Sequence, residues 1–434
     1  MILKDLHQMA DASRRAAWAL AASDLNIRNA ALLAMARKLN AHQEKIFAAN
    51  AADVADATAA NLAAPLLHRL KFREEKLAAV TAGLEALAQL PDPIGQTTIA
   101  RELTEGLTMY RVACPIGVIG VIFESRPDAL VQIASLALKS GNAVLLKGGR
   151  EALRTNAVLC DCLREAAAEV GLPADFAQLL TTREDVAAML REDELIDLII
   201  PRGSNEFVRY IMDNSRIPVL GHADGICHVY VDKAADIDMA VSIAVDSKTQ
   251  NVAVCNAMET LLVHRDISEA YLQKLLPAMQ TKKVRLLGDE NVRAIIPVEP
   301  ADEADWATEY LDYTLSIRVV DDLDAAIEHI NHYGSGHTDC IVTSDTSAAK
   351  AFLTRVDSAG VYHNVSTRFA DGFVYGFGAE VGIATGKIHA RGPMGLEGLT
   401  TYKYKLLGSG QLMAEMKSGA RHYTHKLLNE ECPL

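Results

Sequence analysis

Between residues 114 and 212, short apolar segments alternate with longer segments whose apolar residues recur at helical spacing. The short segments 117–123 (GVIGVIF) and 143–147 (AVLLK) are apolar throughout, which is typical of strands buried on both faces of a parallel sheet. Segment 129–139 between them has the pattern of an apolar helix that Gly141 closes. The alternation continues through 151–170, 176–181, 185–190, 196–201 and 204–212. We therefore predict an α/β fold with a doubly wound parallel sheet and ligands at the carboxyl ends of its strands.

The regions on either side follow other patterns. Residues up to about 89 are rich in alanine, with apolar positions at helical spacing, so we expect several packed helices. Residues 92–111 alternate turn residues with β-branched ones, which suggests a hairpin. The tail opens with a strand-like LTTYKYKLL and then becomes polar. A second α/β unit begins at about residue 227, with a strand and helix series at 258–263, 316–320, 323–330, 339–343, 347–355 and 360–364.

Composition and charge restrict the class of protein. Half of the 434 residues are hydrophobic and charges of both signs occur, as in a soluble globular protein of two or three domains. The net charge of −13 argues against a general binder of nucleic acid or anionic membranes, although a few basic groups can still bind a small anion. Seven scattered cysteines indicate a reducing compartment. No apolar run approaches the roughly 20 residues that cross a bilayer, and the amino terminus lacks a signal-peptide core, so we expect a cytoplasmic protein.

Cys255 stands in a setting that suits chemistry. A polar run at 247–251 leads to the cysteine and Asn256, and a strand pattern follows at 258–263. A catalytic cysteine needs donors or positive charge that favour its thiolate, and Lys248, Asn251 and Asn256 are candidates for these groups. This stretch alone nevertheless favours a structural cysteine, because cysteine is among the most buried residue types.

Three strand-to-helix junctions are candidate sites for phosphate or ribose. No GxGxxG fingerprint follows the first strand, and the junctions instead read FESRPD, KGGRE and PRGSNE. Small residues at a helix amino terminus leave backbone amides free for an anion, while Lys147, Arg150 and Arg202 add positive charge. Each pattern is weak by itself, since a glycine-rich turn capped by a residue such as Ser204 is usually only a turn.

The other polar clusters leave two interpretations open. In GSGHTDC, the residues His337, Thr338 and Asp339 could form a site or a turn. Further along the chain, Asn364, Arg368 and Glu380 could contact a ligand or be solvated loop groups. We expect no metal, because no group of His, Cys, Asp or Glu has convincing ligand spacing. A serine nucleophile is not supported either, since no Gly-x-Ser-x-Gly element occurs.

Six of these stretches, in this order, resemble the aldehyde dehydrogenase superfamily and, within it, the gamma-glutamyl phosphate reductase family. The stretches are CPIGVIGVIFESRPD (114–128), GNAVLLKGGREA (141–152), PRGSNEFV (201–208), VCNAMETLLVH (254–264), 320–341 ending in HYGSGHTDCI, and 362–404. Each match is modest, but six in order are specific. The resemblance covers nearly the whole chain and reverses the odds on Cys255, which matches the nucleophile of the family.

The resemblance implies a function for each part of the chain. Residues 1–91 and 114–226 would form an NADP-binding domain, 227–397 a catalytic domain, and 92–113 with 398–434 an oligomerisation flap and tail. Arg126, His337 and Arg368 are candidate contacts to the phosphate or carboxylate of a substrate. The implied cofactor contacts are Ser125, Lys147, Gly148, Gly203, Ser204 and, near the nicotinamide ribose, Glu309.

Two departures from the superfamily pattern narrow the expected reaction. Hydrolytic members carry a glutamate base in a Glu-Leu-Gly-Gly stretch, and the matching LGHADGICHVYV lacks it. They also place an asparagine in the oxyanion hole, where Ser125 or Arg126 stands here. Without a base that activates water, a thioester at Cys255 should be reduced or passed to phosphate rather than hydrolysed.

The activity that the resemblance implies is the NADPH-dependent reduction of L-glutamyl 5-phosphate to L-glutamate 5-semialdehyde, the second step of proline biosynthesis from glutamate. The Cys255 thiolate would attack the acyl carbon, phosphate would leave without a general acid, and hydride would reduce the thioester. The Cys255 backbone amide and Asn256 would hold the oxyanion.

Two alternatives are weaker. An ordinary NAD(P)-dependent aldehyde dehydrogenase would need the missing glutamate, and a dinucleotide-binding structural or regulatory protein would not need an intact Cys255 segment. We expect a homo-oligomer, and association with glutamate 5-kinase stays open.

Overall fold

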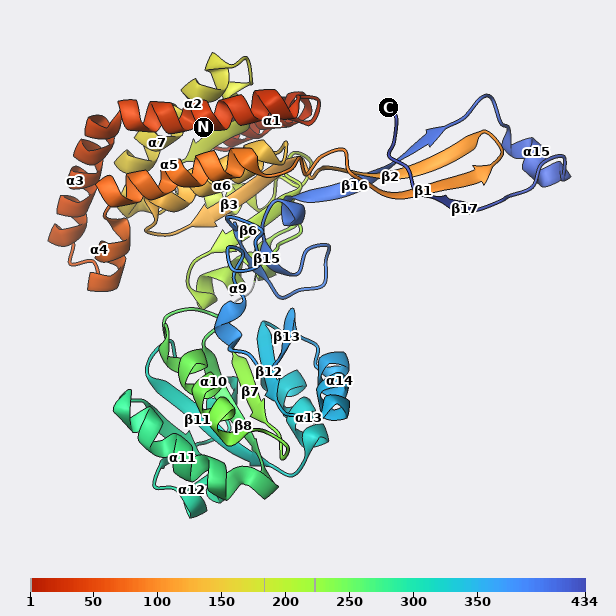
Figure 1. Cartoon of the computed structure of the whole chain (residues 1–434). Coiled ribbons are helices and arrows are strands. Elements are labelled where there is room, and N and C mark those ends of the chain that lie inside the picture. The colour runs from red at the N-terminus through yellow and green to blue at the C-terminus, as the bar shows by residue number, and fades with distance from the viewer. Residues whose placement is uncertain (1, 183, 222–223) are drawn as a thin grey trace. The chain divides into compact units, whose positions relative to one another are not determined.

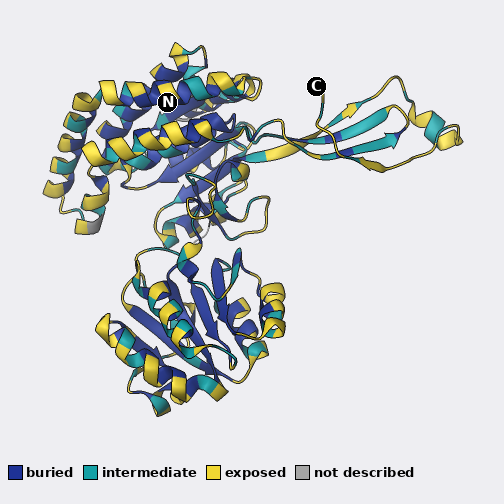
Figure 2. Ribbon diagram, in the orientation of Figure 1, coloured by how far each residue is buried: buried dark blue, intermediate teal, exposed yellow. Residues whose placement is uncertain are grey.

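The computed structural model describes residues 2–182, 184–221 and 224–434 (Figure 1). These residues form two compact units. The first comprises the chain up to Leu220 together with Phe377–Gly382 and Met394–Leu434, and the second comprises Gly221–Gly376 and Ile383–Pro393. In each unit the buried residues follow the strands of the sheet, and the exposed residues follow the outer faces of the helices (Figure 2).

Five helices open the first unit, as the alanine-rich pattern predicts. Leu32, Met35 and Leu39 recur at helical spacing and are fully buried. They lie on α2, which packs against α5 and α7. The five helices are α1 (Ile2–Ala21), α2 (Leu25–Ala41), α3 (Gln43–Ala59), α4 (Ala64–Leu70) and α5 (Glu74–Gln89).

A four-stranded parallel sheet in the order β5-β4-β3-β6 follows in the first unit. Its strand β3 is buried at every residue. The continuous apolar pattern of 117–123 therefore correctly predicted a strand that is covered on both faces. Its strands are β3 (Val118–Phe123), β4 (Ala143–Lys147), β5 (Ala177–Leu180) and β6 (Leu198–Arg202). The intervening helices are α6 (Pro127–Lys139), η1 (Arg150–Ala152), α7 (Leu153–Glu169), η2 (Ala174–Phe176) and α8 (Glu184–Met189), and α9 (Asn205–Asn214) follows β6.

The second unit contains a seven-stranded sheet in the order β10-β9-β11-β8-β7-β12-β13, and all its recorded pairings are parallel. Its strands are β7 (Cys227–Val231), β8 (Met258–His264), β9 (Arg285–Gly288), β10 (Glu299–Pro300), β11 (Thr314–Val320), β12 (Thr338–Val342) and β13 (Gly360–His363). Its helices are α10 (Ile237–Thr249), η3 (Arg265–Ile267), α11 (Ser268–Thr281), α12 (Glu290–Ile295), η4 (Asp305–Ala307), α13 (Leu323–Tyr333), α14 (Thr346–Arg355) and η5 (Thr367–Phe369).

Aspartate caps fix where several of these helices begin. The side chains of Asp236, Asp289, Asp322 and Asp345 each accept a hydrogen bond from a backbone N–H in the first turn of the following helix. Such a cap satisfies a donor that the helix itself cannot pair and contributes about 1 kcal/mol. The caps therefore set the length of the loops that connect each strand to its helix.

The predicted hairpin and the tail combine in a separate antiparallel sheet of the first unit, in the order β16-β2-β1-β17. Figure 1 shows this sheet as a long ribbon that extends from the helical part of its unit. The hairpin prediction is confirmed, and β17, in the polar part of the tail, was not foreseen. The elements are β1 (Thr97–Thr104), β2 (Leu107–Pro115), η6 (Glu397–Leu399), β16 (Thr400–Leu407), α15 (Met413–Ser418) and β17 (Lys426–Leu428).

Two short strands, β14 (Gly382–Ala384) and β15 (Gly392–Met394), pair where the chain passes between the units. The bounds of the two units do not test the predicted assignment of functions to domains, which stays a prediction. The predicted domains are 1–91 with 114–226, 227–397, and 92–113 with 398–434. Among the helices described, none combines the length and the apolar character that crossing a membrane requires.

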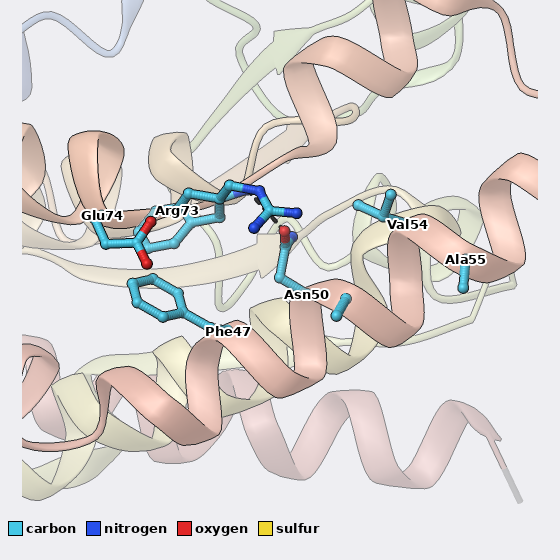
Figure 3. Close-up of a pocket in the computed structure, with 8 residues that line it drawn as sticks. Phe47, Asn50, Val54, Ala55, Arg73 and Glu74 are labelled. Atoms are coloured by element: carbon cyan, nitrogen blue, oxygen red, sulfur yellow. Dashed lines mark hydrogen bonds between the residues drawn. The ribbon is translucent and has the colours of Figure 1, made fainter.

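A pocket of about 250 Å³ lies in the first unit between α3 and the segment that leads into α5 (Figure 3). Its polar centre, Asn50, donates to Leu70 O and Thr155 Oγ1 and accepts from Phe72 N. The amide thus ties α3 to its neighbours, and the walls that surround it are mainly apolar. We assign no chemistry to this pocket.

Candidate active site around Cys255

Three turns of the second unit meet at one edge of its sheet. Strands β8, β7 and β12 are neighbours in that order, and Cys255, Gly225 and His337 lie in the turns that precede them. Because the strands are parallel, their amino ends share an edge. A Cβ atom on Gly225 would lie 2.4 Å from Cys255 Cα, so only glycine permits this approach. The thiol therefore lies at the amino ends of these strands.

His337 is the side chain in contact with the Cys255 thiol. Its Nε2 atom lies 3.2 Å from Cys255 Sγ, and its Nδ1 atom lies 2.9 Å from Thr338 Oγ1. The imidazole is buried and the cysteine is half-buried. The sequence singled out His337 only as a contact to the substrate, and that role stays a prediction.

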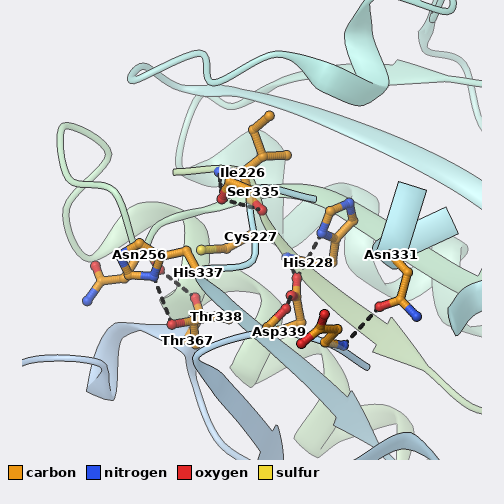
Figure 4. A network of polar contacts seen from close by, with 12 residues as sticks. Ile226, Cys227, His228, Asn256, Asn331, Ser335, His337, Thr338, Asp339 and Thr367 are labelled. Carbon is orange, nitrogen blue, oxygen red and sulfur yellow. Dashed lines mark hydrogen bonds and ion pairs between the residues drawn. The ribbon is translucent and has the colours of Figure 1, made fainter. Parts of the chain in front are cut away.

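Asn256 joins the turn that contains Cys255 to the loop after β13. Its Nδ2 atom donates to Ala370 O at 2.9 Å and to Arg368 O at 3.4 Å, while Thr367 Oγ1 donates to Asn256 O at 2.7 Å. Figure 4 shows Asn256, His337, Thr338 and Thr367 gathered on one side of this network. The donors of the side-chain amide are thus already engaged with the loop. An oxyanion contact from Asn256 stays a prediction, for which its backbone N–H is the better group.

Arg368 supplies positive charge to the same site. Its Nε atom donates to Gln250 Oε1 at 2.9 Å, and its guanidinium interacts electrostatically with Cys255. Burial lowers the pKa of Arg368, and the interaction with Cys255 opposes that shift. The structure thus brings together four predicted residues of the second unit, namely Cys255, Asn256, His337 and Arg368. Arg126, the remaining predicted substrate contact, is exposed at the start of α6 in the first unit.

Lys248 does not belong to the surroundings that the sequence suggested. Its ammonium is fully buried and lies 2.5 Å from Glu259 Oε2, and the Glu259 carboxylate is fully buried too. Burial raises the pKa of Glu259 to about 7, and Lys248 opposes this rise. Glu309, the predicted ribose contact, interacts electrostatically with both groups.

The other cysteines have different environments. The described cysteines form no disulfide. Cys227 is fully buried, its Sγ atom lies 3.3 Å from Cys255 O, and burial raises its pKa well above the ordinary value. Burial also raises the pKa of the thiols of Cys160, Cys162 and Cys340. These four are structural thiols, in contrast to Cys255.

A second polar group lies behind the site, on β7 and β12. Asp339 accepts hydrogen bonds from the backbone N–H of His228 and from Ser358 Oγ, and its Oδ1 atom lies 2.8 Å from His228 Nδ1. His228 and Asp339 are fully buried. Figure 4 shows this pair apart from His337 and Asn256, so the Asp339 carboxylate is occupied elsewhere in the network.

The predicted cofactor residues of the first unit lie at the carboxyl ends of β3, β4 and β6. Ser125 adopts a left-handed backbone (φ 42°) and donates through N and Oγ to Glu151 Oε1 at 2.8 and 2.5 Å. Lys147 Nζ donates to Gly148 O at 2.6 Å. These strand ends are where a doubly wound sheet holds its ligand.

Glu124, which the sequence did not single out, occupies a helix amino terminus at one of these strand ends. It follows β3, and its carboxylate accepts a hydrogen bond from the backbone N–H of Ser204 at the start of α9. This helix end therefore already receives an anionic group. A Cβ atom on Gly203 would lie 3.2 Å from that carboxylate. A cofactor contact from Gly203 or Ser204 stays a prediction.

Comparison with known proteins identifies the family. A sequence profile of the aldehyde dehydrogenase family matches residues 3–312. The gamma-glutamyl phosphate reductase of Acetivibrio thermocellus is 57% identical over 99% of this chain and 100% of its own length. The chain belongs to the gamma-glutamyl phosphate reductase family. A second member, from Pelotomaculum thermopropionicum, is 56% identical over 98% of both chains.

Solved structures agree with this family assignment. The crystal structure of gamma-glutamyl phosphate reductase from Thermotoga maritima matches with a TM-score of 0.92 and 40% identity, over 94% of this chain and 99% of that one. An acetylating aldehyde dehydrogenase from Geobacillus thermoglucosidasius shares the fold, with a TM-score of 0.63, 16% identity and coverage of 94% and 98%. Both the predicted family resemblance and the predicted aldehyde dehydrogenase-like α/β fold are confirmed.

The structure adds a residue that sequence reasoning missed. Gly225 acquires a role only through the pairing of β7 with β8 and β12, and no local pattern marks it. Thr338 belongs to the GSGHTDC cluster, which the sequence left open as a site or a turn. In the stretch that replaces the glutamate of hydrolytic members, His222 and Ala223 lie outside the described residues. Among the residues that the structure does describe, no group of three or more His, Cys, Asp or Glu side chains is arranged to hold a metal ion.

Proposed function

We propose that this chain reduces L-glutamyl 5-phosphate to L-glutamate 5-semialdehyde and phosphate, with NADPH as the reductant and Cys255 as the nucleophile. The setting of Cys255 carries the proposal. Its half-buried thiol touches His337 and interacts with the Arg368 guanidinium, and both contacts favour the thiolate that attacks an acyl carbon.

The chain's own residues would divide the work as follows. Cys255 forms the thioester, and its backbone N–H with that of Asn256 faces the oxyanion. Arg368 and Arg126 bind the phosphate or the glutamyl carboxylate, because a guanidinium matches both anions. Ser125, Lys147, Gly148, Gly203, Ser204 and Glu309 bind the cofactor. NADPH, when bound, supplies the hydride that reduces the thioester.

The free edge of β16 supports a proposal about assembly. Pairing is recorded on the β2 side of β16 only, while β17 covers the outer edge of β1. Tyr402, Tyr404 and Leu406 on β16 are exposed. An unpaired edge with apolar side chains is suited to a partner chain, and we assign a second copy of this chain to it. A cytoplasmic location and association with glutamate 5-kinase stay predictions from the sequence.

The reverse reaction tests the function without the labile acyl phosphate. The purified protein is given glutamate 5-semialdehyde and NADP⁺, with and without inorganic phosphate, and NADPH is followed by its absorbance. Turnover that requires phosphate and disappears in Cys255→Ala is the expected result. Turnover without phosphate would instead mean that water deacylates the enzyme, as in an ordinary aldehyde dehydrogenase.

A further inference from the structure

In the first chemical step a proton must leave the Cys255 thiol and a proton must reach the departing phosphate, and Cys255 alone cannot transfer it. When the thiol attacks the acyl carbon, the S–C bond forms, the C–O bond to phosphate breaks, and the thiol loses its proton. The departing group would be a phosphate trianion, a strong base, unless it receives a proton as it leaves. The thiol thus releases one proton on one side of the reacting carbon, and the departing phosphate requires one proton on the other side.

His337 is placed to carry this proton. Its Nε2 atom lies 3.2 Å from Cys255 Sγ, within reach of the thiol proton. Its Nδ1 atom lies 2.9 Å from Thr338 Oγ1. When the Nδ1–H donates to this hydroxyl, Nε2 presents its lone pair to the thiol and can accept the proton of Cys255.

Thr338, which contacts His337 Nδ1, suits an imidazole that passes a proton on rather than one that stays charged. A carboxylate on Nδ1 would stabilise the imidazolium and oppose release of its proton. Thr338 offers a neutral hydroxyl instead, and the carboxylate of Asp339 is bound by His228 and Ser358. Among the described residues, Arg368, which is cationic, and Cys227, whose buried thiol is neutral, interact electrostatically with the thiol.

We propose that His337 is the acid–base group of the acylation step, and that Thr338 positions it. Nε2 takes the proton of the Cys255 thiol as the S–C bond forms and gives it to the departing phosphate oxygen as the C–O bond breaks, so that hydrogen phosphate leaves. After reduction of the thioester, the C–S bond breaks and the released thiolate takes a proton from solvent, which is the proton consumed overall. This inference rests on the proposed function and replaces the sequence-based expectation that phosphate leaves without a general acid.

Two acyl-transfer reactions separate this role from simple activation of the thiol. Phosphate-dependent oxidation of glutamate 5-semialdehyde requires hydrogen phosphate to give up a proton, by microscopic reversibility. Acylation of Cys255 by p-nitrophenyl acetate requires no proton transfer to its leaving group, since p-nitrophenolate is a stable anion. We compare the wild type with His337→Gln in both reactions at about pH 9.5, above the usual ionisation range of a free thiol.

The expected result is a split between the two reactions. Acylation of His337→Gln by p-nitrophenyl acetate should approach the wild-type rate, while its phosphate-dependent turnover should stay about 10²- to 10⁴-fold lower, the usual contribution of general acid–base catalysis. Recovery of both reactions at high pH would overturn the proposal and leave His337 only as an activator of the thiol. Unchanged phosphate-dependent turnover at neutral pH would overturn it as well.

Thr338 provides a matched pair of variants for the positioning role. Thr338→Val removes the hydroxyl at nearly constant volume and should lower kcat for phosphate-dependent turnover with little change in the KM for the semialdehyde. Thr338→Ser keeps the hydroxyl and should retain most of the activity. Equal rates for the two variants would contradict the role of Thr338, and thermal unfolding of each variant identifies a loss caused by misfolding. If the wild type itself shows no phosphate-dependent turnover, the proposed function fails, and not the proton relay alone.

Discussion

At the scale of single residues, the backbone around Cys255 is as important as the groups that touch its thiol. Gly225 lies against the nucleophile turn, and a Cβ atom there would come within 2.2 Å of Cys255 O and 2.6 Å of Cys255 Cβ. Both are far inside the van der Waals contact distance. The glycine in the turn before β7 therefore restricts where Cys255 can lie.

We predict that Gly225→Ala displaces Cys255 and lowers kcat at least about 10²-fold, since small misplacement of a reacting group has costs of this order. The rate at which iodoacetamide alkylates Cys255 reports the displacement directly. Gly386→Ala is the control, because a Cβ atom at Gly386 meets no heavy atom within 4 Å. Wild-type kcat in Gly225→Ala would show that the turn tolerates the added methyl group.

His329 makes the stability of the second unit depend on pH. It is buried, its Nδ1 atom lies 2.9 Å from Arg318 Nη1, and its ring packs against Trp306. Burial, with smaller contributions from His228 and Arg318, lowers the pKa of His329 from 6.5 to about 2. The unfolded chain therefore binds a proton that the native protein excludes when the pH falls below 6.5.

We predict that His329 contributes up to about 1.4 kcal/mol of stability per pH unit as the pH rises towards 6.5. The free energy of unfolding of His329→Gln should accordingly vary less steeply with pH below 6.5 than that of the parent. Urea unfolding followed by Trp306 fluorescence measures it, in a Trp18→Phe background that removes the other tryptophan, whose side chain is 66% exposed. Parallel pH profiles in the two proteins would contradict the prediction.

The polar flanks of Cys255 and the strand after it are local features that drew attention to this residue, but they alone favoured a structural cysteine, and the family resemblance reversed that interpretation. It also named His337 and Arg368, although only as substrate contacts. Their distances to the thiol depend on β7 lying between β8 and β12, and on the loop that Asn256 holds. Local periodicity carries no information on strand order, so Gly225 could not be found from the sequence alone, and Thr338 could not be connected to the thiol.

At the scale of elements, a buried ion pair joins α10 to β8 below the nucleophile turn. Lys248 and Glu259 have no exposed side-chain surface, and Lys248 Nζ lies 5.8 Å from the centre of the Tyr310 ring. Each charge lost its hydration on folding, and each depends on the other for compensation. The pair thus links the helix and the strand that flank Cys255.

We predict that Glu259→Leu alone destabilises the protein by about 3 to 5 kcal/mol, because it leaves the Lys248 charge buried and unpaired. The double variant Lys248→Met with Glu259→Leu should be less destabilised than either single variant, since no uncompensated charge is left. Urea unfolding in the Trp18→Phe background measures all three. A double variant whose loss equals the sum of the single losses would show that the two groups act independently.

Most elements of both α/β regions could be predicted because continuous apolar strands and capped amphipathic helices each have a distinct local period. Segment 143–147 coincides with β4, and the predicted strand 117–123 differs from β3 by one residue. β17 could not be found in this way, because it has three residues and no buried face. Its pairing with β1 is stabilised by tail contacts, including Tyr110 Oη to Glu430 at 2.6 Å and Cys432 N to Thr97 Oγ1 at 2.9 Å.

At the scale of the whole molecule, the tail determines which edge of the antiparallel sheet β16-β2-β1-β17 stays available for pairing with another chain. β17 covers β1, so that β16 presents the free edge, and three exposed apolar side chains alternate along it. Tyr402 packs edge to face on Tyr404 with ring centres 5.7 Å apart, and the Arg111 guanidinium lies 4.8 Å from the centre of the Tyr402 ring. This face of the sheet is therefore ordered without a partner and ready to bury apolar area on association.

We predict that the double variant Tyr404→Glu with Leu406→Glu converts the proposed assembly to smaller species, because charge placed on both sides of a shared strand edge repels and is costly to bury. Sedimentation velocity at several protein concentrations measures the change. Lys403→Glu is the control, since Lys403 lies on the same strand between Tyr402 and Tyr404, where side chains point to the opposite face. Cys255 lies in the second unit, so alkylation of its thiol should persist in the smaller species. An unchanged sedimentation coefficient in the double variant would mean that the subunits associate through another surface.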